Sequence, residues 1–174
     1  SGETVIILFA DIANSTALTE HLGDAGFRQK ARELDSALRA IIREYAGTPI
    51  EGKLLGDGVL AEFRGARQAI EAALACGRAG DEGELPLHLG LHAVDVMREE
   101  GNVYGGAVNI AARISNLTEP SEVLVSQTVR DLARTSASVT FHDRGERRLK
   151  GVADLVRLWA VRAKTTNSSS IEAE

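Results

Sequence analysis

Residues 47–63 (GTPIEGKLLGDGVLAEF) restrict the fold more than any other segment of this 174-residue chain. Two short apolar segments flank Gly56-Asp57-Gly58, and an Asp-Gly pair between strand-like segments is a strong hairpin signal. A hairpin pairs its strands antiparallel. The segment therefore favours a sheet that is at least partly antiparallel over an all-parallel α/β sheet.

The rest of the chain alternates between strand-like and helix-like segments. Apolar residues recur at helical spacing over 16–45, where Gly23 and Gly26 predict two helices or one broken helix, and residues 14–16 (NST) supply candidate N-caps. Residues 85–96 alternate like a strand with one buried face. The remaining predictions are strands at 4–9, 123–126, 139–141, 148–149 and 156–161, helices at 67–77, 107–116 and 127–135, and a loop at 80–83.

This order is βαββαβ followed by a helix and further strands. It predicts an α+β fold with a ferredoxin-like βαββαβ core, a mainly antiparallel sheet with helices packed on it, and extra C-terminal strands. The single cysteine, Cys76, excludes a disulfide framework. A net charge of −5 argues against nucleic-acid binding, and no apolar run approaches the roughly 18 residues of a membrane span. We therefore expect a reduced intracellular domain.

Asp11 ends the first predicted strand, and Asp57 lies in the predicted hairpin turn. If these elements are neighbours in the sheet, both carboxylates meet at one rim, where a hard divalent cation would relieve their repulsion. Two aspartates bridging two metals are a common arrangement for in-line attack at phosphorus. The alternative is that Asp57 is only a turn residue and Asp11 only a helix cap.

Asn109 and Arg113 have i, i+4 spacing and share one helix face, from which Arg113 could spread charge over phosphate oxygens. The alternative is a solvated Asn beside a surface Arg. Lys53 and Lys150 could equally be ordinary strand-edge lysines. Three other residues fit structural roles better: His88 and His92 lack a third metal ligand in the sequence, and Cys76 lies on the apolar face of a helix.

Four segments, taken together, resemble the catalytic domain of the class III nucleotidyl cyclases. They are FADIANST (9–16), GKLLGDGVLAEF (52–63), NVYGGAVNIAAR (102–113) and RRLKGV (147–152), in the family's order and spacing. The resemblance extends over about residues 4–162. It implies a catalytic domain at 4–164. Apart from the resemblance, residues 1–3 are expected to be a terminus or tag remnant, and the polar residues 165–174 a disordered tail.

The resemblance implies a role for each matching residue. Asp11 and Asp57 match the metal-binding aspartates, with the backbone carbonyl of Ile12 as a further ligand, for two Mg²⁺ or Mn²⁺ ions per site. Asn109 and Arg113 match the pair that orients the ribose and stabilises the transition state. The substrate-binding residues would be Lys53 and Asn102 at the purine, Lys150 at the terminal phosphates, and the main chain of Ile12, Ala13, Asn14, Ser15 and Thr16 at the triphosphate.

The same resemblance predicts the substrate and the assembly. Lys53 only donates hydrogen bonds and suits adenine N1, whereas Asn102 can turn its amide toward either purine. We therefore expect ATP as substrate, with less strict exclusion of GTP. In this family the site forms between two domains arranged head to tail, and this chain carries both halves, so we expect a homodimer with two composite sites.

The alternatives are a cyclase-like module that binds nucleotide without turnover, or a cyclase with relaxed ATP/GTP selectivity. We expect a cytoplasmic catalytic domain with no membrane insertion by this segment and no nucleic-acid partner. A regulatory domain is expected elsewhere in the full-length protein.

Overall fold

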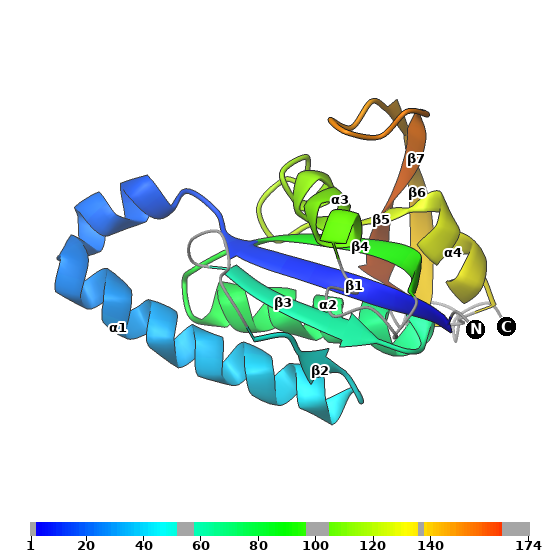
Figure 1. Ribbon diagram of the computed structural model, residues 1–174. Coiled ribbons are helices and arrows are strands. Elements are labelled where there is room, and N and C mark those ends of the chain that lie inside the picture. The colour runs from blue at the N-terminus through cyan, green and yellow to red at the C-terminus, as the bar shows by residue number, and fades with distance from the viewer. Residues whose placement is uncertain (1–2, 52–57, 97–104, 136–137, 165–174) are drawn as a thin grey trace, which may run out of the picture.

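The computed structural model describes residues 3–51, 58–96, 105–135 and 138–164. Within these ranges the chain forms one sheet in the order β2-β3-β1-β4-β5-β7-β6 (Figure 1). Among the described strands only β4 and β5 pair in parallel, which confirms the mainly antiparallel sheet. The strands are β1 (Glu3–Ile12), β2 (Thr48–Pro49), β3 (Gly58–Phe63), β4 (Leu87–Val96), β5 (Val123–Ser126), β6 (Val139–Arg147) and β7 (Val156–Ala163).

The described helices are α1 (Ser15–Glu44), α2 (Ala66–Glu82), α3 (Gly105–Ser115) and α4 (Gln127–Ala133). Gly23, with φ 78° and ψ 159°, breaks α1 into two helical segments, as predicted. In Figure 1 the shorter N-terminal segment turns away from the long second segment, which runs beside the sheet. The sequence periodicity was therefore a reliable guide to both the helix and its interruption.

Two predictions about local structure were wrong. Residues 80–82 continue α2 instead of forming a loop, because Gly80 lets the helix approach the next turn closely: a Cβ there would lie 2.7 Å from the Leu85 carbonyl oxygen. Residues 148–149 belong to the connection between β6 and β7, not to a strand. Leu149 is buried there and Gly151 has φ +85°, so the apolar residue anchors a turn.

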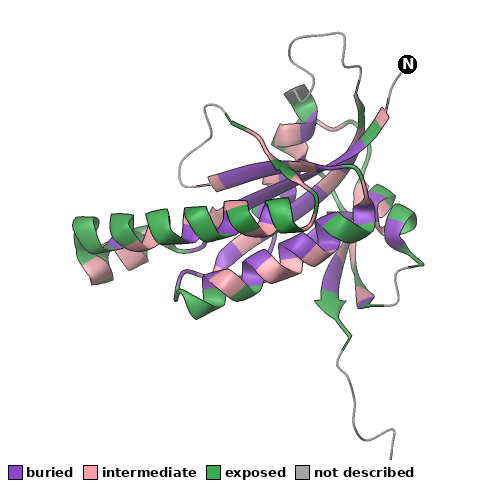
Figure 2. Ribbon diagram, turned by 90° about the horizontal axis from the view of Figure 1, so that it is seen from below, coloured by how far each residue is buried: buried purple, intermediate pink, exposed green. Residues whose placement is uncertain are grey.

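The helices cover the sheet unequally. One core cluster joins α1, α2 and α4 to one face of the sheet, and two smaller clusters join α3 and the β6–β7 connection to the opposite face. Figure 2 shows α1 and α2 side by side, with exposed residues along the outer side of α1. Because β1 is covered on both faces, residues 5–10 (VIILFA) are all buried, which explains their unbroken apolar run.

Strand β4 is also covered on both faces, and not on one as predicted. Leu87, Leu89 and Leu91 pack with α2 in the large cluster, while Gly90 faces α3. A Cβ at Gly90 would lie 2.5 Å from the Ser115 backbone nitrogen, closer than real Cβ contacts come. The glycine therefore sets how closely α3, with its candidate catalytic side chains, lies on the sheet.

Candidate active site

Asp11 lies near the C-terminal end of β1 and is partly buried. Its Oδ1 accepts a hydrogen bond of 2.9 Å from the Ile12 backbone N–H. Asp11 is the register partner of Gly58, the first residue of β3 and the residue that follows Asp57 in the chain. Strands β1 and β3 are therefore neighbours in the sheet, which is the condition under which the two carboxylates would meet at one rim. Asp57 itself lies outside the described residues, as do Lys53 and Asn102.

The main chain after Asp11 turns directly into α1. The Ile12 N–H donates to the Asp11 carboxylate and the Ala13 N–H to the Pro86 carbonyl at 2.8 Å. Asn14 is the N-cap, in a left-handed conformation (φ 55°, ψ 37°), but its side chain does not cap the helix. Helical geometry leaves the first-turn N–H groups, such as those of Ser15 and Thr16, without an intrahelical acceptor. These are the main-chain groups best suited to meet a phosphate.

Helix α3 and the β6–β7 connection bring a second group of candidates together. Asn109 is exposed on α3, while Arg113 is half-buried and donates from its guanidinium to the backbone carbonyl of Lys150. The next residue, Gly151, lies so close that a Cβ would be 3.0 Å from Arg113 Nη1. Gly151 was not predicted as part of the site, although its Lys-Gly sequence could have indicated a turn.

Both groups of candidates belong to the α3 side of the sheet. Side chains alternate along a strand, so Asp11 shares a face with Ile7 and Phe9. Those two residues pack in the same cluster as Ala107 and Ala111 of α3. The carboxylate of Asp11 and the guanidinium of Arg113, which holds the Lys150 carbonyl, therefore lie on the same side of the sheet.

The other ionisable residues considered from the sequence have structural roles. His88 Nδ1 lies 2.8 Å from Thr118 Oγ1, and His92 Nδ1 lies 3.0 Å from Ser126 Oγ. Burial lowers the pKa of His92 and raises the pKa of the Cys76 thiol to about 12. Within the part of the chain that the structure describes, no three His, Cys, Asp or Glu side chains group as a metal site.

Comparison with known proteins adds independent evidence. Residues 87–163 match the adenylate and guanylate cyclase catalytic domain. A Rhizobium meliloti (strain 1021) protein provisionally named adenylate cyclase 3 is 34% identical over 115 residues, which cover 62% of this chain and 20% of that protein. The adenylyl cyclase CyaB from P. aeruginosa has a similar structure, with a TM-score of 0.81 and 20% identity over 95% of this chain and 97% of that chain.

A further solved structure, an adenylate/guanylate cyclase/hydrolase from Silicibacter pomeroyi, is 28% identical with a TM-score of 0.74, and covers 92% of this chain and 97% of that one. The fold and these matches define a nucleotide cyclase catalytic domain. More specifically, the family match over residues 87–163 and the structural neighbours are class III adenylate/guanylate cyclases, whose catalytic-domain fold this chain shares.

These matches differ in what they cover. The chain spans between 17% and 47% of the length of the curated relatives that it matches. The family match over 87–163 includes the positions of Asn109, Arg113 and Lys150, whereas Asp11 and Asp57 lie on its N-terminal side. In the described residues no helix is both long and apolar enough to cross a bilayer.

Proposed function

We propose that this chain is the catalytic domain of an adenylate cyclase, which converts ATP to 3′,5′-cyclic AMP and pyrophosphate. One observation carries the proposal: the register that pairs Asp11 with Gly58 brings the end of β1, the start of α1 and the neighbour of Asp57 to one rim of the sheet. That rim offers carboxylate oxygens beside unpartnered helical N–H groups. This combination suits a metal-bound triphosphate.

The metal ligands in this proposal are Asp11, Asp57 and the backbone carbonyl of Ile12. All are oxygen donors, the set that Mg²⁺ and Mn²⁺ prefer, so the residues present fit two such ions. Bound ions of this kind lower the pKa of a coordinated hydroxyl and offset phosphate charge. The aspartates hold the ions, and the N–H groups of Ser15 and Thr16 orient the triphosphate.

The reaction forms a bond between the ribose 3′-oxygen and the α-phosphorus and breaks the bond from that phosphorus to the pyrophosphate oxygen. The 3′-hydroxyl proton passes to water or to a substrate phosphate oxygen. Asn109 orients the ribose, Arg113 offsets charge on the α-phosphate oxygens, and Lys150 holds the leaving pyrophosphate. The hydrogen bond from Arg113 to the Lys150 carbonyl supports this assignment, because it keeps the two cationic residues adjacent.

Lys53 and Asn102 set the base preference in this proposal. A lysine donor matches the acceptor N1 of adenine and opposes the N1–H of guanine. Asn102 can present its oxygen to the adenine amino group or its nitrogen to guanine O6, which weakens the discrimination. ATP is therefore preferred, and GTP is excluded less strictly than it would be with Asp at position 102.

The proposed active form is a head-to-tail homodimer with two sites. Asp11 and Asp57 of one chain face five residues of the other: Lys53, Asn102, Asn109, Arg113 and Lys150. The catalytic domain is residues 4–164 and lies in the cytoplasm, with regulatory input from a further domain of a longer protein. The small share of the relatives' length that this chain spans supports the last point.

The direct test measures cyclic AMP and cyclic GMP formed from ATP and GTP by the purified chain with Mg²⁺ or Mn²⁺. Asp57→Ala should abolish product formation while the circular dichroism spectrum stays unchanged. Asp24→Asn, which changes an exposed carboxylate of α1, serves as the matched control and should keep full activity. A folded wild-type chain that binds ATP without turnover would instead establish the non-catalytic regulatory module.

A mixing experiment tests the composite site. Asp57→Ala and Arg113→Ala chains are each expected to be inactive, but a mixed dimer contains one interface site with both halves intact. Mixing should therefore restore part of the wild-type activity. Failure to recover activity, after mass spectrometry has shown subunit exchange, would contradict sites shared between chains.

A further inference from the structure

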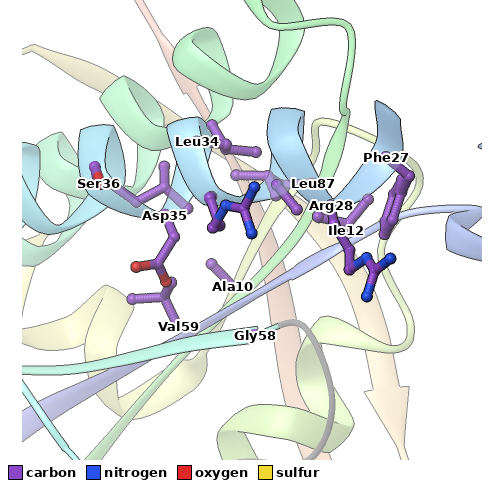
Figure 3. Close-up of a pocket in the computed structure, with 13 residues that line it drawn as sticks. Ala10, Ile12, Phe27, Arg28, Leu34, Asp35, Ser36, Gly58, Val59 and Leu87 are labelled. Carbon is purple, nitrogen blue, oxygen red and sulfur yellow. The ribbon is translucent and has the colours of Figure 1, made fainter. Parts of the chain in front are cut away.

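A cavity of about 520 Å³ lies between α1 and the sheet, on the face opposite to the candidate active site. Figure 3 shows it between the side chains of the long segment of α1 and the ends of β1 and β3. Phe27, Leu34 and Leu38 of α1 and Val59 of β3 are buried around it. The volume is within the range of small-molecule sites, roughly 300–1,000 Å³.

Small residues of both α1 and β1 line the cavity. Ala31 of α1 and Ala10 of β1 both line it, at positions where the flanking residues of the helix are the larger Phe27 and Leu34. Helix α1 thus contacts the sheet on either side of Ala31 and leaves a space beneath it. The pocket is partly open to solvent, and its volume leaves room for a small molecule between the helix and the sheet.

The rim of the cavity is positively charged. Arg28 and Arg32 of α1 both line it, and Arg32 donates to the neutral Gln29 side chain at 2.9 Å. Among the described residues no carboxylate forms an ion pair with either arginine. Among the described residues that line the cavity, the one acidic residue is Asp35, and it pairs with Arg39 at 2.9 Å. In Figure 3 the Arg28 guanidinium lies beside Ile12, at the edge of the apolar floor.

We propose that this cavity binds a small amphipathic anion, with an apolar body between α1 and the sheet and a carboxylate or sulfonate at Arg28 and Arg32. Apolar lining with a few placed charged groups is the usual composition of such sites. The ligand would touch Ala10 and Ile12, the backbone neighbours of Asp11, from the side of β1 opposite to its carboxylate. Binding itself does not depend on the proposed cyclase activity.

The test uses the full chain with labelled Leu and Val methyl groups and two probes that share a ring system. These are 8-anilinonaphthalene-1-sulfonate, an amphipathic anion, and the neutral N-phenyl-1-naphthylamine. The anion should shift the methyl resonances of Leu34, Leu38 and Val59 in a saturable, one-site manner. Ala31→Phe, which fills the cavity, should lower the affinity for both probes at least 10-fold.

Charge recognition is tested by Arg28→Gln, with Arg43→Gln as the control at an exposed position of the same helix outside the cavity. Arg28→Gln should lower the affinity for the anion by about 2- to 5-fold, as expected for a partly exposed ion pair, and should not change the affinity for the neutral probe. Arg43→Gln should not change the affinity for either probe. Equal loss for both probes would overturn the anionic preference. Unchanged cavity methyl resonances, or displacement of the anion by ATP, would overturn the site while leaving the proposed cyclase function standing.

Discussion

Gly90 controls the position of α3, and Gly90→Ala tests that control. The new Cβ would lie 2.5 Å from the Ser115 nitrogen and 2.6 Å from the Ala111 carbonyl oxygen, both backbone atoms that no rotamer change can move. Relief requires α3 to move away from β4 by several tenths of an ångström. Overpacking of this kind costs about 1–3 kcal/mol in free energy of unfolding. For a chain of this size that lowers Tm by about 2–12 °C.

The matched control makes the same chemical change on α3. Gly106 is exposed, and a Cβ there has no atom within 4 Å, so Gly106→Ala should raise stability by up to about 1 kcal/mol. Urea unfolding followed by circular dichroism measures both variants. Because α3 also carries Asn109 and Arg113, Gly90→Ala should lower cyclase activity more than Gly106→Ala does. A Gly90→Ala chain as stable as wild type would refute the close packing of α3 on β4.

Three further predictions follow from backbone conformation and burial. Gly23 has φ +78°, so Gly23→Ala should destabilise the chain by about 1 kcal/mol in urea unfolding, whereas Gly26→Ala, whose Cβ would meet only a 3.7 Å contact, should be neutral or stabilising. Burial lowers the pKa of His92, so the native state disfavours its protonation. The free energy of unfolding should therefore be unaffected by His92 above the ordinary imidazole pKa of about 6.5 and should fall as the pH decreases below it. Urea titrations should show a smaller pH dependence for His92→Gln. Burial raises the pKa of the Cys76 thiol to about 12, so iodoacetamide at pH 8 should label Cys76 in 6 M guanidinium chloride but not in the native chain, and rapid native labelling would contradict its burial.

The sequence was most informative where one local rule dominates. Strand β5 was predicted with its observed bounds, because four consecutive apolar or small residues between turn signals leave few alternatives. The kink at Gly23 followed from glycine interrupting a helical period. Local rules failed at Gly80 and at residues 148–149, because tertiary packing decides there: Gly80 continues a helix packed on the chain's next turn, and Leu149 is buried from within a turn.

The candidate site divides in the same way. The proximity of Asp11 to the start of β3 could be predicted, since a hairpin that neighbours the first strand brings their ends together. The contact from Arg113 to the Lys150 carbonyl could not, because it joins residues 37 positions apart through a connection whose conformation depends on Gly151. Spacing shows which residues share a helix face, but not which distant turn packs against that face.

The side chains of β1 point alternately to opposite faces of the sheet, so the two sites that we propose lie on opposite faces. This separation gives a way to distinguish their functions. Ala10 and Ile12 face the cavity beneath α1, whereas Asp11, between them, belongs to the α3 side. A variant that fills the cavity, such as Ala31→Phe, alters no proposed metal or substrate ligand. If it abolishes anion binding but leaves basal cyclase activity intact, the two surfaces act independently. If it changes both, the shared backbone of β1 is the shortest connection through which one site can influence the other.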